Sequence, residues 1–319
     1  MTSLRCAVVG AGYLGRFHAQ KYAALADCEL VGVADPSAEA RERLKGELGV
    51  PTFADHRELL GRVDAVSIAT PTSLHHALAR DFLAAGAHAL VEKPITATAE
   101  EARELIALAA SKGLVLQVGH LERFNPVILA VEGELSNPRF IESNRLAPFK
   151  PRGTDVSVVL DLMIHDIDLI EHVVRSPIAS IDAIGAPVFT DEIDIANARI
   201  RFANGCVADV TASRISLKAE RKLRVFQADA YLSIDLQQKI LTVIRKKDAA
   251  PVESPAQVSI EEDSFDQGDA LLAEIEAFLR SVRAGSPPVV SGEDGLRALE
   301  TAMQITRLVQ QSTQKQTQK

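Results

Sequence analysis

Residues 4–15 read LRCAVVGAGYLG, an apolar run that breaks into the glycine pattern G-x-G-x-x-G. The run predicts a buried β-strand, and the stretch 16–26 after it predicts a helix. A second apolar run over 29–34 ends in Asp35, twenty residues beyond the last glycine of the pattern. The order of strand, glycine turn, helix, strand and acid predicts a dinucleotide-binding unit. A glycine-rich turn in some other α/β protein would not be followed by an acid at this spacing.

Each residue type in the turn suits a bound pyrophosphate. Gly10 permits the tight turn after the strand, Gly12 lets backbone N–H groups approach the phosphates, and Gly15 lets the helix pack on the sheet. The phosphates are expected at the positive end of the helix that starts near Gly12. Tyr13 and Leu14 complete the turn and are assigned to the same cofactor site.

Asp35 indicates which dinucleotide is bound. Its carboxylate can accept hydrogen bonds from both ribose hydroxyls and would repel a 2′-phosphate. The residues that follow it are Pro, Ser and Ala, with no Arg directly after the acid. The sequence therefore predicts NAD rather than NADP.

Composition limits the class of protein. The 319 residues are 47% hydrophobic and 24% charged, enough for two domains at about 150 residues each. The net charge of -8 argues against a broad nucleic-acid or anionic-membrane surface. The three cysteines show no metal-type spacing and are read as buried, reduced thiols. With no signal sequence and no apolar run near 20 residues, we expect a cytoplasmic protein without membrane or nucleic-acid partners.

The first third alternates short apolar runs with helical patterns. Strands are expected at 64–69, 87–91 and 114–118, and helices at 73–85 and 99–111. Fully apolar strands separated by helices are typical of a parallel sheet covered on both faces. Residues 1–120 are therefore predicted to form a doubly wound Rossmann domain. Ligands of such sheets bind beyond the carboxyl ends of the strands.

The remainder, residues 121–319, is predicted to be an α+β domain built on a large open, mostly antiparallel sheet. The tail from 310 is expected to fray. The predicted segments are helices at 123–132, 156–174, 269–283 and 292–309, a strand at 140–146, successive strands over 180–244, and a polar surface loop at 251–266.

Two groups of residues follow strands of the first domain. Thr70 and Pro71 with His75, and Glu92 with Lys93, are assigned to the cofactor site. Lys93 is expected beside the nicotinamide, where partial desolvation would suit it to proton handling or to hydrogen bonding of a substrate hydroxyl. The alternative is a solvated lysine in a surface turn. Of the neighbours His75 and His76, one is expected to face the site and the other solvent.

Asp161 and His165 lie four residues apart in a strongly apolar helix, so they share one face, which Asp168 continues. Burial and a nearby carboxylate oppose each other in their effect on an imidazole, which can make His165 a general base. The alternatives are a pair that satisfies itself in the core, or a metal site. The set lacks recognised ligand spacing, so no metal is predicted.

Six further side chains are candidates for substrate binding. Three are cations that precede the apolar helix and could bind a diphosphate or a carboxylate of the substrate. It is equally consistent with the sequence that these three cations lie in a solvated loop without a ligand. The other three lie just beyond the last parallel strand. The six are Arg145, Lys150, Arg152, His120, Arg123 and Asn125.

Together these segments resemble the glucose-fructose oxidoreductase / inositol dehydrogenase / rhizopine-catabolism family over nearly the whole length. The resemblance rests on the glycine turn with Asp35, on Ala69-Thr70-Pro71 with His75, on Glu92-Lys93-Pro94, on Gly119 through Pro126, and on Asp161-x-x-x-His165-x-x-Asp168. It implies a Rossmann domain, a second domain with an open sheet, and homodimers or homotetramers. It also implies that Lys93, Asp161 and His165 are the catalytic residues and that a cis proline is common at Pro94.

A narrower similarity, over 145–168, is to the branch of this family that oxidises C3 of UDP-N-acetylglucosamine for lipid A. Val158-Val159 replace the glycine pair that is more usual in the family. The implied reaction is hydride transfer from a sugar secondary alcohol to NAD, with Lys93 and His165 acting in one cleft. The alternatives are a dehydrogenase of a free sugar or cyclitol, and a non-catalytic NAD-sensing regulator of the same fold.

Overall fold

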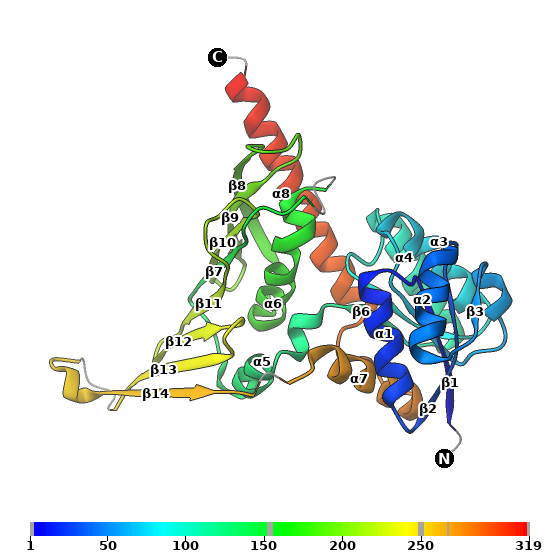
Figure 1. Ribbon diagram of the computed structural model, residues 1–319. Helices are drawn as coiled ribbons and strands as arrows, with labels where there is room; N and C mark the ends of the chain where they lie inside the picture. The colour runs from blue at the N-terminus through cyan, green and yellow to red at the C-terminus, as the bar shows by residue number, and fades with distance from the viewer. Residues whose placement is uncertain (1–2, 152–155, 248–251, 267, 318–319) are drawn as a thin grey trace. The chain divides into compact units, whose positions relative to one another are not determined.

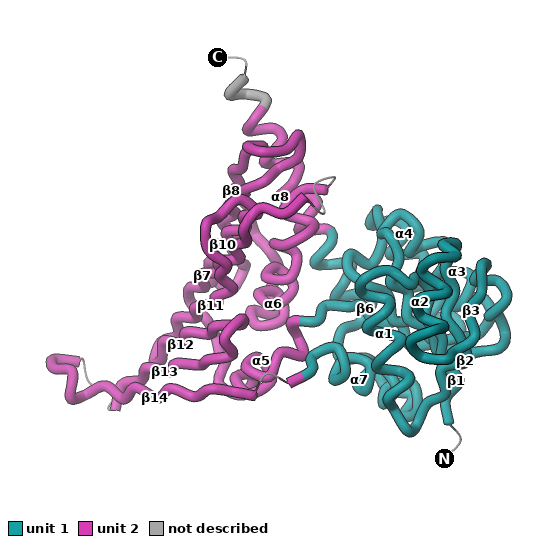
Figure 2. The backbone as a smooth tube through the Cα atoms, in the orientation of Figure 1, with its two compact units in different colours: residues 1–121, 269–299 teal, residues 122–268, 300–319 magenta. Residues whose placement is uncertain are grey.

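The computed structural model describes residues 3–151, 156–247, 252–266 and 268–317, with side chains through residue 313. The chain forms two compact units (Figure 2). Unit 1 contains residues 1–121 and 269–299, and unit 2 contains 122–268 and 300–319. The sequence analysis placed a single boundary after residue 120. The difference is the segment 269–299, which belongs to unit 1 because its helix packs into that unit's core.

Unit 1 is built on the predicted parallel sheet. Its six strands lie in the order β3-β2-β1-β4-β5-β6, and every pair is parallel. The strand order reverses between β1 and β4, and open α/β sheets bind ligands at such a reversal. The strands are β1 (Leu4–Val9), β2 (Cys28–Ala34), β3 (Thr52–Phe53), β4 (Ala65–Ile68), β5 (His88–Glu92) and β6 (Leu116–Gly119).

The helices of unit 1 are α1 (Tyr13–Ala24), α2 (Ala38–Leu48), α3 (Thr72–Ala84), α4 (Ala99–Lys112), α7 (Ala270–Ala284) and the beginning of α8 (Gly292–Thr317), with a short 3₁₀ turn η1 (His56–Leu59) (Figure 1). The helix α7 lays Ile275, Phe278 and Leu279 into the core that also holds Tyr22 and Leu90. The sequence analysis did not identify α2, whose residues are mostly polar and which buries only Leu44 fully.

Unit 2 contains the predicted open sheet. Its eight strands lie in the order β14-β13-β12-β11-β7-β10-β9-β8, and all pairs are antiparallel except β7 with β10. The strands are β7 (Phe140–Leu146), β8 (Ile178–Ala186), β9 (Ile195–Phe202), β10 (Val207–Ser213), β11 (Glu220–Phe226), β12 (Ala230–Asp235), β13 (Ile240–Lys246) and β14 (Val258–Ser264). Buried and exposed residues alternate along β9, so one face of the sheet is covered and the other is open.

Three predictions for unit 2 were wrong in detail. The expected helix 123–132 is divided into a 3₁₀ turn η2 (Leu121–Phe124), α5 (Pro126–Val131) and a second 3₁₀ turn η3 (Glu132–Glu134), because Pro126 fixes a new helix start with Asn125 as its cap. The expected loop 251–266 contains the edge strand β14, which pairs with β13 along its whole length. The tail expected to fray continues α8 as far as Thr317.

The long apolar helix is interrupted by a π turn. Residues Val159–Met163 (η4) form the π segment, and α6 (Ile164–Val174) continues from it. Figure 1 shows α5, α6 and the later part of α8 on one side of the unit 2 sheet. Among the described residues, no helix is long and apolar enough to cross a membrane.

Candidate functional site

The glycine turn of unit 1 has the backbone that its sequence predicts. Gly10 has φ +99°, and a Cβ at this position would lie 2.3 Å from the carbonyl oxygen of Ala69. A Cβ at Gly15 would lie 1.9 Å from the carbonyl oxygen of Gly10. By contrast, a Cβ at Gly12 would meet no atom within 4 Å. Gly10 and Gly15 are therefore required by the fold, whereas the small size of Gly12 leaves open space in front of the turn.

The beginning of α1 is suited to a bound diphosphate. Gly12 is its N-cap residue, which provides no side-chain hydrogen bond, and the first turn contains no acidic residue. Unpaired N–H groups at a helix start attract anions. Tyr13 and Leu14 are 63% and 39% exposed, so apolar surface flanks the same opening. The turn therefore suits the pyrophosphate of a dinucleotide: it leaves open space at Gly12, it has no acidic residue, and exposed apolar side chains flank it.

Asp35 lies at the carboxyl end of β2, where its carboxylate is held by backbone donors. Oδ2 accepts from the N–H of Ala11 at 2.6 Å, and Oδ1 accepts from the N–H of Ser37 at 2.8 Å. Arg43 donates to the carbonyl of Ala11 at 2.8 Å and Arg41 to the carbonyl of Asp35 at 2.6 Å. These two arginines lie beyond the three residues that the sequence argument considered, and their guanidinium groups already bind backbone oxygens.

His75 is fully enclosed and connects two of the predicted turns. Its Nδ1 lies 2.9 Å from the carbonyl oxygen of Pro94, and its Nε2 lies 2.9 Å from the carbonyl oxygen of Thr70. The neighbouring His76 contacts Glu104 at 3.0 Å. Of the two histidines, His75 is thus the one turned inward. Its contacts indicate that it holds the turns after β4 and β5 in place.

Lys93 follows β5 directly and is half-buried, with a cis peptide bond to Pro94. The side chain of Glu92 lies beneath this turn: Oε2 accepts from the backbone N–H of Lys93 at 3.3 Å, and Oε1 lies 3.0 Å from Nε2 of His18 on α1. Burial acts to raise the pKa of Glu92, but the hydrogen bond and charge of His18 and the charge of Lys93 outweigh it and lower that pKa.

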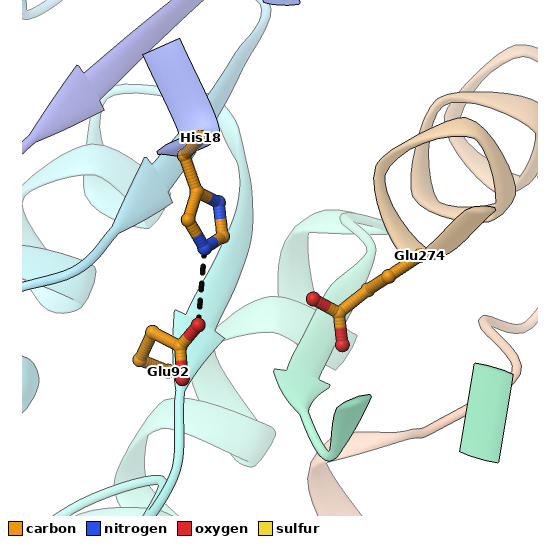
Figure 3. Close-up of side chains that lie close together, drawn as sticks. All are labelled: His18, Glu92 and Glu274. Carbon is orange, nitrogen blue, oxygen red and sulfur yellow. Dashed lines mark hydrogen bonds and ion pairs between the residues drawn. The ribbon is translucent and has the colours of Figure 1, made fainter. Parts of the chain in front are cut away.

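A third side chain, Glu274 of α7, points toward this pair (Figure 3). One ligand-type atom from each of His18, Glu92 and Glu274 lies within 4.8 Å of the other two. The sequence pattern alone did not indicate His18 or Glu274 as site residues. Each of the two is a titratable residue on the buried face of its helix, α1 or α7. That pattern predicts a shared site only when the positions of both helices on the sheet are known.

In unit 2, Asp161 lies in the π turn η4 and His165 lies one helical turn later in α6. Both side chains are half-buried, whereas the intervening Met163 and Ile164 are fully buried. Single π turns within α-helices are frequent at functional sites. The structure therefore presents Asp161 and His165 on a partly accessible face, as a general base and its orienting partner require. Asp168, three residues after His165, is buried and forms an ion pair with Arg123.

Arg145 is buried on β7 and forms ion pairs with two carboxylates. Its Nε and Nη2 donate to the two oxygens of Asp166 at 2.6 and 3.2 Å, and Nη1 donates to Glu122 at 2.8 Å. Burial would lower the pKa of Arg145, but the charges of Asp166 and Glu122 raise it. All three guanidinium nitrogens are used, so these contacts favour a structural role over the substrate contact that the sequence suggested.

Arg123 and Asn125 are also committed to the core of unit 2. Arg123 donates from Nε and Nη2 to the carboxylate of Asp168 at 2.7 and 2.9 Å. Asn125 caps α5 by accepting from Val127, and it donates to the carbonyl of Leu236 at 3.0 Å. As with Arg145, the sequence showed polar residue types but not their partners, which lie up to 111 residues away.

The other substrate candidates have different surroundings. His120 is buried directly after β6 in unit 1, and Lys150 is exposed in the segment that follows β7 in unit 2. Arg152 lies outside the described residues. Of the three cations proposed as a phosphate clamp, Lys150 is the one that the structure describes as solvent-accessible.

Two family models match the chain. Residues 4–120 match the oxidoreductase family model with an NAD-binding Rossmann fold, and residues 128–233 match the GFO/IDH/MocA C-terminal domain.

Individual relatives extend over nearly the whole length. The chain is 41% identical to a UDP-N-acetylglucosamine 3-dehydrogenase from Acidithiobacillus ferrooxidans, covering 96% of this chain and 97% of that protein. A solved structure of the same enzyme superimposes with a TM-score of 0.90 at 40% identity, covering 97% of this chain and 98% of that chain. An inositol 2-dehydrogenase from Rhizobium meliloti is 28% identical over 98% of each chain.

Proposed function

Because the chain belongs to the GFO/IDH/MocA oxidoreductase family, whose N-terminal domain binds NAD, we propose that it oxidises C3 of UDP-N-acetylglucosamine. The observation that carries this proposal is the full-length similarity to the Acidithiobacillus ferrooxidans enzyme, which continues through the segment with Lys150, Asp161 and His165. The open space at Gly12, the uncapped start of α1 and Asp35 fit the diphosphate and ribose of the cofactor. When bound, NAD supplies the hydride acceptor.

The residues of the chain would manage the proton and orient the sugar. His165 takes the proton of the C3 hydroxyl, and Asp161, on the same helical face, orients the imidazole and stabilises its charged form. Lys93 of unit 1 can donate a hydrogen bond to a substrate hydroxyl and stabilise the negative charge that develops as its proton leaves. The half-buried environment of all three groups strengthens these interactions relative to water.

Two further assignments complete the proposal. Lys150 is the candidate contact for the diphosphate of the nucleotide sugar, because it is exposed while Arg145 is fully paired. The protein is proposed to act in the cytoplasm as a homodimer or homotetramer, with the open sheet of unit 2 as the surface between copies.

The test is a ligand panel in the presence of NAD. UDP-N-acetylglucosamine, UDP-glucose and myo-inositol are compared by thermal shift and by NADH absorbance, with hydrazine added to trap the ketone and draw the oxidation forward. We expect a thermal shift and NADH formation with UDP-N-acetylglucosamine, and a ketone two mass units lighter than the substrate, recovered as its hydrazone when hydrazine is present. A shift with myo-inositol alone would favour the cyclitol dehydrogenase, the activity named for the Rhizobium relative. No shift with any UDP-sugar would overturn the assignment.

A further inference from the structure

Glu274 of unit 1 is buried with no visible partner for its carboxyl group. Its side chain lies on the face of α7 that also carries Ile275 and Phe278, and its exposed fraction is 0%. Neither carboxyl oxygen has a hydrogen-bond partner among the described residues. Burying an isolated carboxylate in this way costs several kcal/mol, so such groups usually take up a proton instead.

Two further polar atoms in this part of unit 1 are buried without a hydrogen-bond partner among the described residues. Gln117 of β6 donates from Nε2 to the backbone carbonyl of Glu274 at 3.2 Å, which leaves its Oε1 buried and unpaired. The imidazole of His18 faces Glu92 through Nε2, and its Nδ1 is buried and unpaired. No donor among the described residues reaches the carboxyl group of Glu274, which favours its uncharged form over a buried carboxylate.

Glu92 has the opposite environment. Its carboxylate faces the imidazole of His18 and accepts from the backbone N–H of Lys93, so its charge is stabilised from two sides. Gly119 of β6 makes room for this arrangement, since a Cβ there would lie 3.1 Å from Oε2 of Glu92. Carboxyl groups of Glu92 and Glu274 within 4.8 Å of each other in a buried site repel each other when both are charged, so the charge of Glu92 raises the pKa of Glu274.

We propose that Glu274 is an uncharged carboxylic acid that, together with His18, confines a single negative charge to Glu92, which accepts from the backbone N–H of Lys93. Figure 3 shows these three side chains, His18, Glu92 and Glu274. Glu274 and His18 are then positioning residues, because they act on the proposed reaction only through Glu92 and Lys93. The inference deepens the function proposed above and rests on it for the role of Lys93. The protonation state of Glu274 does not depend on that function.

The remaining titratable groups around the cluster agree with this assignment. Burial, and then the charge of Glu92, raise the pKa of Glu274 well above its usual value. The charges of Lys93 and His75 act on Glu92 in the direction that keeps it ionised. Tyr22, on the same helix as His18, is fully buried and shares a 2.9 Å hydrogen bond with Ser67, so it contributes no charge.

A bound cation is the main rival explanation for the cluster. One imidazole and two carboxylates could reach a divalent ion, and that ion would let both glutamates stay charged. A histidine that binds a metal almost always donates its other ring N–H to an acceptor. Nδ1 of His18 has no such partner among the described residues. The hydrogen bond that would orient a metal-binding histidine is therefore absent among the described residues. This absence favours a proton on Glu274 over a bound cation.

The first experiment compares thermal unfolding of the wild-type protein and Glu274→Gln from pH 5 to pH 9, with metal analysis of both. The amide mimics the uncharged acid and keeps a donor, but it cannot ionise. A carboxyl group whose pKa is raised in the folded state contributes most to the stability of the fold below its ordinary pKa of 4.5. This contribution is lost as the pH rises from that value through the raised pKa of the folded state. We expect equal unfolding temperatures near pH 5 and a growing advantage of the variant toward pH 9.

A stoichiometric divalent metal in the wild-type protein that chelation removes, together with a large destabilisation of Glu274→Gln at every pH, would overturn the proposal. Parallel pH curves for the two proteins would also overturn it. Glu274→Leu, which has no donor, is expected to be less stable than Glu274→Gln at pH 6. Because these measurements use no substrate, they stand even if the proposed reaction is wrong.

The second experiment tests the effect of the Glu92 charge on Lys93. In Glu92→Gln, Lys93 loses its counter-charge, so we expect turnover to fall about tenfold or more and the alkaline limb of the pH–rate profile to move to lower pH. A purely structural change would lower the unfolding temperature without moving that limb. Glu104→Gln, which removes the half-exposed pair with His76, is the matched control. An unmoved limb in Glu92→Gln would refute this part of the proposal.

Discussion

Gly12 differs from the other two glycines of its turn, because a side chain there would disturb no protein atom. A Cβ at Gly12 would enter open space where the cofactor diphosphate is expected, whereas one at Gly15 would collide with the backbone of Gly10. We expect Gly12→Ala to unfold at the wild-type temperature but to bind NAD more than about tenfold more weakly, equivalent to about 1.4 kcal/mol.

Calorimetric titration with NAD and thermal unfolding measure these two effects. The control is Gly46→Ala within α2, where a Cβ also meets nothing within 4 Å. This change should stabilise the helix by about 0.5–1 kcal/mol and leave NAD affinity unchanged. Undiminished NAD binding by Gly12→Ala would mean that the diphosphate does not lie at this turn.

For His165, we expect replacement by Ala to lower turnover by about 10²–10⁴-fold, the usual contribution of one acid–base group. The affinity for NAD should stay nearly constant, because the predicted cofactor contacts belong to unit 1. Steady-state turnover and NAD titration measure the two effects. His172→Ala, seven residues later in α6 and partly exposed, is the control. An equal loss of NAD binding in His165→Ala would refute the role of His165 as the base.

At the residue scale, sequence could predict the sites whose chemistry is local. The glycine turn, Asp35 and the Asp161–His165 spacing are set by residues within one or two elements. Arg145 could not be interpreted in this way, since an arginine that binds phosphate and one that binds Asp166 have the same local sequence. Glu274 was missed for a related reason, because the groups that surround its carboxyl, His18 and Glu92, come from other elements of unit 1.

The buried arginine of β7 leads to a prediction at the scale of the elements that it joins. Arg145 connects β7 to Asp166 of α6 and to Glu122, and all three side chains are nearly inaccessible. Arg145→Ala would leave the buried carboxylate of Asp166 without its ion-pair partner and Glu122 with the more distant Arg221 at 3.7 Å, so we expect the free energy of unfolding to fall by about 3–5 kcal/mol. Urea denaturation measures this loss.

The exposed cation Lys150 provides the matched comparison. Lys150→Ala should change stability by less than about 0.5 kcal/mol while raising the Michaelis constant for the UDP-sugar. If Arg145→Ala is as stable as the wild-type protein but has a raised Michaelis constant for the UDP-sugar, Arg145 rather than Lys150 is the phosphate contact.

Element prediction succeeded where burial imposed a pattern on the sequence. The strands of unit 1 are mostly apolar because helices cover both faces of their sheet. The sequence of β14 predicts a loop because most of its side chains are exposed and its apolar content is low, although each of its residues is paired with β13. The π turn at Val159–Met163 also left no trace, since one inserted residue per turn changes hydrogen bonding without changing composition.

At the scale of the whole molecule, the open face of the unit 2 sheet carries a hollow lined by polar side chains such as Asn197 and Thr211, which are hydrogen-bonded to each other at 2.9 Å. We expect light scattering to give at least twice the 34.4 kDa mass of one chain. A charge at the centre of this face, Thr211→Arg, should lower the mass toward one chain, whereas Ala107→Arg on α4 should not. A single-chain mass for the wild-type protein would refute the proposed assembly.

The return of residues 269–299 to unit 1 has a consequence for biosynthesis. The ribosome releases residues 1–121 roughly 150 positions before α7, an interval on the order of ten seconds or more. Throughout that time the surface around Tyr22 and Leu90 lacks the cover that Ile275 and Phe278 provide. The nascent dinucleotide-binding half must therefore wait, partly open and in need of protection from aggregation, until nearly all of the polypeptide has been made.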